Sequence, residues 1–185
     1  QIGNWNTFNK MIHYFENIES IDTNYYITIV EEISNEKTIN LLKKKLKYSV
    51  ILEVKNKGMD IGPFLLNLLY IRINNISHKY IIKIHTKTDD RFREHVLNHL
   101  IGDQSVILNN IEKLKNNKDI GMLTGTLIFN TLNNNSFFNN HMYYLEYISS
   151  VLFSEKIKKS NLEFAIGTFF FSKFEIFKIF DSVNI

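Results

Sequence analysis

The feature that most constrains the fold is a series of alternating segments between residues 49 and 87. Three of residues 49–54 are β-branched and apolar, as in a strand. The turn of residues 56–63 contains the only proline of the chain and two of its seven glycines. An apolar helix-like segment follows, and then an apolar strand, residues 79–84, that ends in a polar tip. This order is typical of an open α/β sheet, in which ligands bind at the carboxyl ends of the strands.

Similar segments before and after this stretch extend the pattern along the chain. Helices are expected over residues 6–18, 36–46, 61–74, 92–101, 105–116, 142–153 and 173–180, and strands over 25–30, 49–54, 79–84, 119–123 and 164–171. Because strands alternate with helices, right-handed crossovers are expected. The predicted fold class is α/β, a Rossmann-like open and mainly parallel sheet flanked by helices, in a single domain spanning residues 1–185.

Composition excludes several classes of protein. Hydrophobic residues make up 44% of the chain and aromatic residues 14%, which excludes a disordered tail. The net charge is +3 and no basic stripe alternates with aromatic residues, so nucleic acid is not an expected partner. The absence of cysteine excludes disulfides and thiolate metal sites. No apolar run approaches the roughly 20 residues of a membrane helix and no signal peptide is recognisable, so a cytoplasmic location is expected.

The turn of residues 56–63 has two interpretations. In the structural one, Asp60 caps the helix that follows, Pro63 lies in its first turn, and Gly58 and Gly62 permit a close approach of helix and strand. In the functional one, the helix N-terminus receives a ribose or phosphate, and Asp60 or Asn56 bonds hydroxyl groups. The residues alone leave both open.

The tip of the second apolar strand is His85-Thr86-Lys87. Lysine carries a compact cation on a long side chain and therefore suits a phosphate. One cation about 4 Å from a phosphate oxygen contributes roughly 4 kcal/mol at an effective dielectric of 20. Arg93, near the start of the next helix, is a candidate second contact. The alternative is a solvent-facing loop with a satisfied histidine.

Two groups of residues raise the question of metal binding. Asp89 and Asp90 could ligate magnesium or manganese, but their loop also contains Arg91, and ordinary surface charge is the favoured interpretation. His95 and His99 lie one helical turn apart, yet no third zinc ligand is evident. A metal is therefore not expected to be required.

Two motifs carry a family resemblance. Residues 56–64, Asn-Lys-Gly-Met-Asp-Ile-Gly-Pro-Phe, and residues 83–87, Lys-Ile-His-Thr-Lys, resemble the rhamnan synthesis protein F family of polysaccharide glycosyltransferases. Supporting matches follow at residues 92–93, 100–103, 120–123 and 164–170. The similarity covers roughly residues 5 to 180.

The resemblance implies a nucleotide-sugar-dependent enzyme of the GT-A class. On that comparison, His85, Thr86 and Lys87 occupy the place of an Asp-x-Asp metal motif. The resulting hypothesis is that Lys87, with His85 and Arg93, replaces a divalent ion and neutralises the donor diphosphate as it leaves. The sugar donor would be bound without a required cofactor, and manganese or magnesium is not favoured. Gly167 and Thr168 would form the wall on the acceptor side.

The chain also departs from the family. A GT-A sheet begins with a strand before the first helix, whereas this chain opens with a helix, and the family continues beyond the Gly-Thr segment. We therefore expect a fragment of a longer polypeptide with further domains, lacking the first strand and the C-terminal region. Asp60, His85 and Glu163 are candidates for the catalytic base, and the sequence does not choose among them.

The expected function is transfer of a hexose or deoxyhexose from a nucleotide diphosphate sugar to a glycan hydroxyl. The alternative is a non-catalytic glycan-binding or scaffold module of the same fold, with Tyr143, Tyr144 and Tyr147 as a stacking platform. A Rossmann-like nucleotidyltransferase is a further alternative, and it would require a carboxylate pair that binds metal.

Overall fold

The computed structural model describes residues 1–19, 21–57, 59–125, 150 and 168–182. The helices and strands in chain order are α1 (Trp5–Glu16), β1 (Tyr25–Val30), the short 3-10 helix η1 (Glu31–Ile33), α2 (Glu36–Lys45), β2 (Ser49–Val54), α3 (Ile61–Ile73), β3 (Tyr80–Lys83), α4 (Asp90–Ile101), α5 (Gln104–Asn116), β4 (Met122–Leu123), β5 (Phe170–Lys173) and the 3-10 helix η5 (Phe174–Ser182). The elements from α1 to α5 agree closely with the predicted segments. The chain is a mixed α/β protein.

Most helices begin at a side chain that caps them. Asn4, Asn35, Asp89 and Asp103 each accept a hydrogen bond from the backbone N–H three residues further on, at 2.9 to 3.0 Å. Such caps satisfy N–H groups that have no partner within the helix. Helix α3 differs, because Asp60 stands at its N-cap position and its side chain makes no capping hydrogen bond. The interpretation in which Asp60 caps α3 is therefore wrong.

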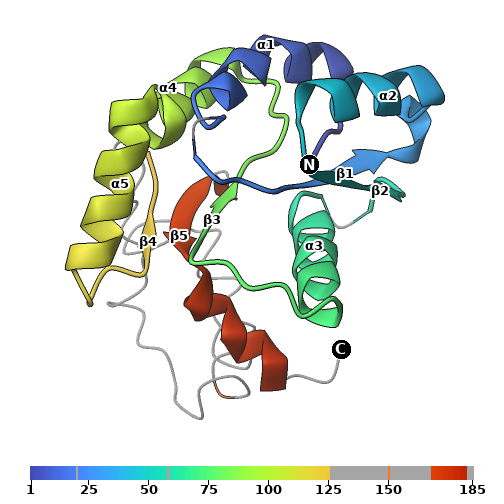
Figure 1. Cartoon of the computed structure of the whole chain (residues 1–185). Helices are drawn as coiled ribbons and strands as arrows, with labels where there is room; N and C mark the ends of the chain where they lie inside the picture. The colour runs from blue at the N-terminus through green and yellow to red at the C-terminus, as the bar shows by residue number, and fades with distance from the viewer. Residues whose placement is uncertain (20, 58, 126–149, 151–167, 183–185) are drawn as a thin grey trace.

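The first half of the chain builds a parallel pair of strands. Strands β1 and β2 run in register from Tyr25 opposite Ser49 to Val30 opposite Val54. Helices α1 and α2 lie on one side of this pair and α3 on the other, as Figure 1 shows. Coverage on both faces explains why both strands are apolar. This pair confirms the predicted parallel arrangement for this part of the chain.

The remaining described strands are antiparallel. Strand β5 lies between β3 and β4 and pairs antiparallel with both. The prediction of a mainly parallel sheet is therefore wrong for this half of the described structure. The apolar residues of β5 indicate a strand that is buried on both faces. They do not indicate whether it pairs parallel or antiparallel with its neighbours, because buried strands of both kinds have a similar composition. The predicted strand over residues 119–123 is also shorter, since β4 covers only Met122–Leu123.

The first residues of the chain connect the two sheets. Ile2 exchanges backbone hydrogen bonds with Thr28 and Val30 of β1, at 2.8 and 3.1 Å. The backbone N–H of Thr86 donates to the carbonyl of Gln1 at 3.0 Å. This extended segment therefore holds the end of β3 beside β1.

Two apolar clusters fill the interior. One lies between α1, α2 and β1 and includes Phe8, Ile29 and Leu42. The other joins α1, α4 and α5 to β5, and its members are Met11, Tyr14, Ile18, Val96, Leu97, Leu100, Ile101, Ile107, Leu114, Phe169 and Phe171. Burial of these side chains fixes the helices against the strands and so fixes the positions of the strand ends.

Among the described residues, no helix has both the length and the apolar composition needed to cross a bilayer. Several predictions fall outside the described residues. They are the helix over 142–153 with its tyrosines, the first part of the strand over 164–171, and the individual residues Gly58, Glu163 and Gly167.

Candidate ligand site at the end of strand β3

The two most specific sequence motifs meet at one ion pair. Lys83, the last residue of β3, pairs through its Nζ with Oδ2 of Asp60, the residue before α3. The same Nζ donates to the carbonyl oxygen and to Oγ1 of Thr168, at 3.0 and 2.8 Å. The Thr168 hydroxyl in turn contacts Asp60 Oδ2. Three segments distant in the sequence therefore converge on one carboxylate.

Lys83 is a buried cation, with a side chain 4% exposed. Its Nζ lies 5.7 Å from the ring centroid of Phe64 and 5.9 Å from that of Phe170, so aromatic faces add to the carboxylate and threonine contacts. Burial lowers the pKa of Lys83, while Asp60 opposes that shift. A buried charge is tolerated only when it is paired and hydrogen-bonded, and this lysine is both.

Asp60 is an ionised carboxylate whose contacts with described residues fall on one oxygen. Burial alone would raise its pKa, but the hydrogen bonds from Lys83 and Thr168 and the charge of Lys83 together lower the pKa below 3.8. The contacts described above all fall on Oδ2. The side chain is 18% exposed, and the hydrogen bonds that it makes with described residues hold it through Oδ2. Oδ1 is therefore the candidate acceptor for a ligand.

His85 completes the inner wall of the site. Its side chain is 10% exposed, its Nδ1 lies 3.7 Å from Asp60 Oδ2, and its ring packs on Phe169 at 4.3 Å between centroids. Burial lowers the pKa of His85 to about 3; Asp60 opposes the shift and Lys83 adds to it. Nδ1 is buried and has no hydrogen-bond partner among the described residues. The imidazole is therefore neutral at neutral pH.

The backbone around the ion pair adopts unusual conformations. Met59 has a φ of 52° and Thr168 a φ of 57°, so two non-glycine residues near Asp60 lie in the left-handed region. Such conformations are disfavoured for side chains, above all for β-branched threonine, and they concentrate at functional sites. Next to them, a Cβ on Gly62 would lie 3.3 Å from the carbonyl oxygen of Lys57, so this glycine lets the first turn of α3 approach the turn that precedes it. Pro63 is buried in the first turn of α3, as predicted.

The loop after β3 is held by internal contacts. Thr86 Oγ1 accepts hydrogen bonds from the backbone N–H groups of Gly3 and Asn4, at 2.8 and 3.2 Å. Arg93 is 1% exposed, donates to the carbonyl oxygen of Lys87 at 2.5 Å and lies 2.8 Å from Asp90. In this conformation the Arg93 side chain therefore supports the loop instead of reaching a ligand, which corrects the predicted phosphate contact.

Lys87 is the accessible cation of this loop. It is partly exposed, and its Nζ lies 5.0 Å from the ring centroid of Phe92. No carboxylate of the described residues lies within ion-pair distance of it. Asn56 is exposed on the turn before α3 and has no hydrogen bond that fixes its side chain among the described residues. Both remain available to a ligand.

The two carboxylates considered as metal ligands have other contacts. Asp89 caps α4 through the N–H of Phe92, and Asp90 pairs with Lys10 at 2.7 Å and with Arg93. Within the described ranges, no group of three His, Cys, Asp or Glu side chains is arranged to hold a metal ion. These carboxylates therefore have local structural roles.

Lys83 is the site residue that sequence reasoning did not single out. A signal was present, because a lysine in the apolar run of residues 80–84 must be paired if its position in the strand points inward. The partner was not visible, since Asp60 lies 23 residues earlier and was considered only as a helix cap, as a ligand contact or as the catalytic base.

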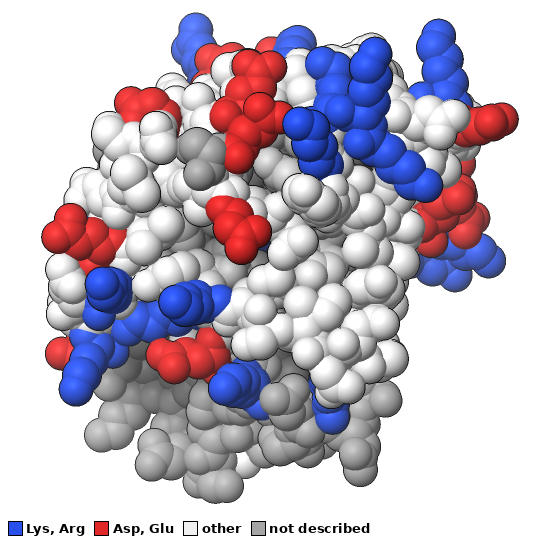
Figure 2. Space-filling model, in the orientation of Figure 1, with Lys and Arg blue, Asp and Glu red and all other residues white. Residues whose placement is uncertain are grey.

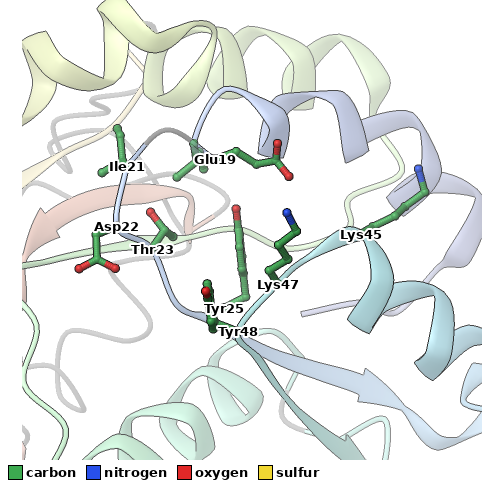
Figure 3. Close-up of a pocket in the computed structure, with 9 residues that line it drawn as sticks. Glu19, Ile21, Asp22, Thr23, Tyr25, Lys45, Lys47 and Tyr48 are labelled. Atoms are coloured by element: carbon green, nitrogen blue, oxygen red, sulfur yellow. The ribbon is translucent and has the colours of Figure 1, made fainter.

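A cavity of about 230 Å³ lies elsewhere, at the amino ends of β1 and β2 (Figure 3). Glu19, Asp22, Lys45 and Lys47 line it together with Tyr25. The hydroxyl of Tyr25 is buried without a hydrogen-bond partner among the described residues. Asp60 follows the carboxyl end of β2. The cavity and the ion pair of Asp60 with Lys83 therefore lie at opposite ends of strands β1 and β2. We place the candidate site at the ion pair because convergent polar groups, and not volume alone, bind a ligand.

Comparison of the chain with protein-family models, curated proteins and solved structures finds no match. The resemblance to the rhamnan synthesis protein F family therefore depends on the two motifs that supply Asp60, Lys83 and His85.

Proposed function

We propose that the chain is a GT-A-like, cytoplasmic glycosyltransferase domain that transfers a hexose or deoxyhexose from a nucleotide diphosphate sugar to a glycan hydroxyl. The observation that carries the proposal is the contact of Asp60 with Lys83 beside His85. These residues come from the two motifs that resemble polysaccharide glycosyltransferases, and they meet at the carboxyl ends of β2 and β3. In open α/β sheets, ligands bind at the carboxyl ends of parallel strands, and β2 is such a strand.

Asp60 binds hydroxyl groups of the donor in this proposal. Its Oδ2 is held by Lys83 and Thr168, so the carboxylate cannot turn away, and Oδ1 accepts from a ribose or sugar hydroxyl. Lys83 neutralises the carboxylate locally, so the pair attracts a neutral hydroxyl without repelling the nearby phosphates. The lowered pKa of Asp60 makes it a weak base, because proton abstraction is most efficient when the pKa is near the working pH.

His85 is also unsuited to accept the proton of the acceptor. Its pKa of about 3 leaves it neutral but weakly basic, and its ring is enclosed by Phe169 and the ion pair. We assign His85 to the wall of the donor site, where a neutral imidazole fills space beside Asp60 without adding charge.

Lys87 meets the diphosphate in this proposal. Arg93 holds the carbonyl of Lys87 and so fixes the loop, while the lysine side chain extends along the Phe92 ring. A cation fixed in advance stabilises the charge that develops on the leaving diphosphate without reorganisation at the moment of reaction. A divalent metal is not needed for this step.

A thermal-shift screen of UDP-, GDP- and dTDP-sugars tests the proposal. A ligand at about 100 times its dissociation constant should stabilise the wild-type protein by roughly 2.7 kcal/mol. Lys87→Ala should lose most of this gain and keep its unliganded melting temperature. Lys115→Ala, on an exposed face of α5, is the matched control and should respond as the wild type does. Equal responses of Lys87→Ala and wild type would refute the role of Lys87.

Isothermal titration separates catalysis from the scaffold alternative. An enzyme should release heat with one class of nucleotide diphosphate sugar, whereas a glycan-binding scaffold should be silent with all of them. A response that requires manganese and vanishes with a chelator would contradict the metal-independent mechanism and redirect attention to Asp89 and Asp90.

A further inference from the structure

Helix α3 is apolar on nearly every side, which is unusual for a helix at the surface. Arg72 is its only charged residue. Its buried residues are Pro63, Asn67 and Ile71, which face the strands. A helix that is apolar all round is expected to be buried all round. The outward side of α3 therefore lacks the polar residues that are expected on a helix face in contact with water only.

Exposed apolar residues occur on this helix and on the turn before it. Leu66 is 44% exposed and Ile73 68%, and because they lie seven residues apart they share one face of α3. Met59, 81% exposed, lies on the turn before the helix, and Ile61, 44% exposed, is the first residue of the helix. We call these four residues the α3 stripe. In Figure 2 the surface at the position of α3 shows neither basic nor acidic side chains.

Basic residues flank the α3 stripe at both ends. Lys55 and Lys57 are exposed on the turn before the helix, and Arg72 and Lys79 are exposed at its other end. Between residues 55 and 79 the only acidic residue is Asp60, whose charge is already paired with that of Lys83. The segment therefore combines an exposed apolar surface with a net positive charge.

We propose that the α3 stripe docks on the surface of an anionic lipid bilayer. In this proposal the exposed apolar side chains enter the boundary between headgroups and acyl chains, and the flanking lysines bind anionic headgroups. Since Asp60 directly precedes α3, docking holds the candidate site close to the membrane surface. The proposal does not depend on the glycosyltransferase assignment, because it concerns a different surface and a different ligand.

A second copy of the chain fits this surface less well. Helix α3 has 13 residues and is therefore about 20 Å long. Four side chains on a helix of that length offer far less than the roughly 800 Å² per partner of a stable protein interface. A bilayer sets no such minimum, and it accounts for the flanking lysines, which would repel each other across a symmetric pair.

Cosedimentation with vesicles tests the proposal. The wild-type protein should bind vesicles of phosphatidylcholine and phosphatidylglycerol in equal parts, and it should bind pure phosphatidylcholine vesicles much more weakly. Leu66→Glu with Ile73→Glu should reduce binding to background, because charged side chains cannot enter the acyl boundary. Leu108→Glu is the matched control, since Leu108 is 51% exposed on α5 and lies outside the stripe.

Charge variants test the second part of the proposal. Each lysine removed near the membrane surface should weaken binding about fivefold, so Lys55→Gln with Lys57→Gln should weaken it roughly 25-fold. Lys113→Gln with Lys115→Gln removes the same charge from the exposed face of α5 and should weaken binding far less. Equal losses in the two pairs would show a general effect of net charge and would refute a docking face at α3.

A site-specific label gives the position of the face directly. The chain has no cysteine, so Ile73→Cys and Leu108→Cys each provide a unique attachment point for an environment-sensitive fluorophore. Anionic vesicles should shift the emission of the label at position 73 to shorter wavelength and leave the label at position 108 unchanged. If neither label shifts its emission, the proposal is overturned. It is also overturned if the protein dimerises without lipid and the Leu66→Glu, Ile73→Glu double variant does not, because the α3 stripe would then bind a second copy of the chain.

Discussion

Two ion pairs of this molecule have the same chemistry and very different surroundings. Lys83 and Asp60 meet between β3 and α3 with side chains 4% and 18% exposed, whereas Lys10 and Asp90 meet between α1 and α4 with side chains 59% and 47% exposed. Water competes for both ions of the outer pair and screens their attraction. The inner pair is mostly desolvated, so each charge depends on the other. Removing a single partner should therefore have consequences only in the inner pair.

The largest effect is expected when the inner pair is broken on the acidic side. Among the described residues, Asp60→Ala leaves the buried ammonium of Lys83 with the contacts to Thr168 and two aromatic rings. The free energy of unfolding should therefore fall by about 3 kcal/mol, which is the lower end for a broken buried pair, because Asp60 is partly exposed. Denaturant unfolding monitored by circular dichroism measures this loss.

A double substitution sharpens the comparison. Lys83→Met combined with Asp60→Ala removes both charges, so much of the stability lost in Asp60→Ala should return. If the double variant is as unstable as the sum of the single variants, the two side chains do not depend on each other and the pair is wrongly assigned.

An intermediate effect is expected from pH, through the buried histidine beside the inner pair. The pKa of His85 is about 3 in the native state and 6.5 in the unfolded chain, so between these values the unfolded state binds more protons. The free energy of unfolding should therefore fall as pH decreases through this window, by up to about 1.4 kcal/mol per pH unit. Unfolding titrations at a series of pH values between 7 and 5, over which the loss should be about 2 kcal/mol, measure the slope.

A histidine variant separates this effect from general acid destabilisation. His85→Phe should make the dependence on pH above 4 less steep, and the remaining slope comes from His78 and the amino group of Gln1, whose pKa values burial also lowers. Asp60 contributes only at lower pH, because its lowered pKa keeps its stabilising charge until pH falls below about 4. A slope in His85→Phe as steep as that of the wild type would assign the transition to other groups.

The smallest effect is expected in the outer pair. Lys10→Ala removes the partner of Asp90, but both side chains are well exposed and Asp90 keeps its contact with Arg93. The melting temperature should therefore stay within measurement scatter of the wild-type value. A clear loss in a scanning fluorimetry experiment would mean that the contact orders α1 against α4, and the contrast with the inner pair would disappear.

The local structure of the chain was predictable from its sequence. The spacing of apolar residues gives the helices from α1 to α5, and asparagine or aspartate at the start of four of them marks where they begin. The turn of residues 56–63 was also expected to lie close to the end of β3. The turn follows β2, and the carboxyl ends of neighbouring parallel strands lie at the same edge of a sheet.

The details of the site were less predictable. Asp60 has the sequence context of a helix cap, yet a buried ammonium competes for its carboxylate more strongly than the backbone N–H groups do. Arg93 has the context of a ligand contact, yet packing of α4 buries it against the Lys87 carbonyl. Both outcomes depend on neighbours far away in the sequence, so local patterns could not reveal them.

By itself, the sequence determined where helices and strands form, because apolar periodicity and capping act within a few residues of one another. The direction of β5, the burial of Lys83 and its choice of Asp60 as partner were decided only by the tertiary structure. The physical reason is that the sequence of a strand does not specify the direction of the strands beside it. A charged side chain likewise has no fixed partner until packing excludes water from around it.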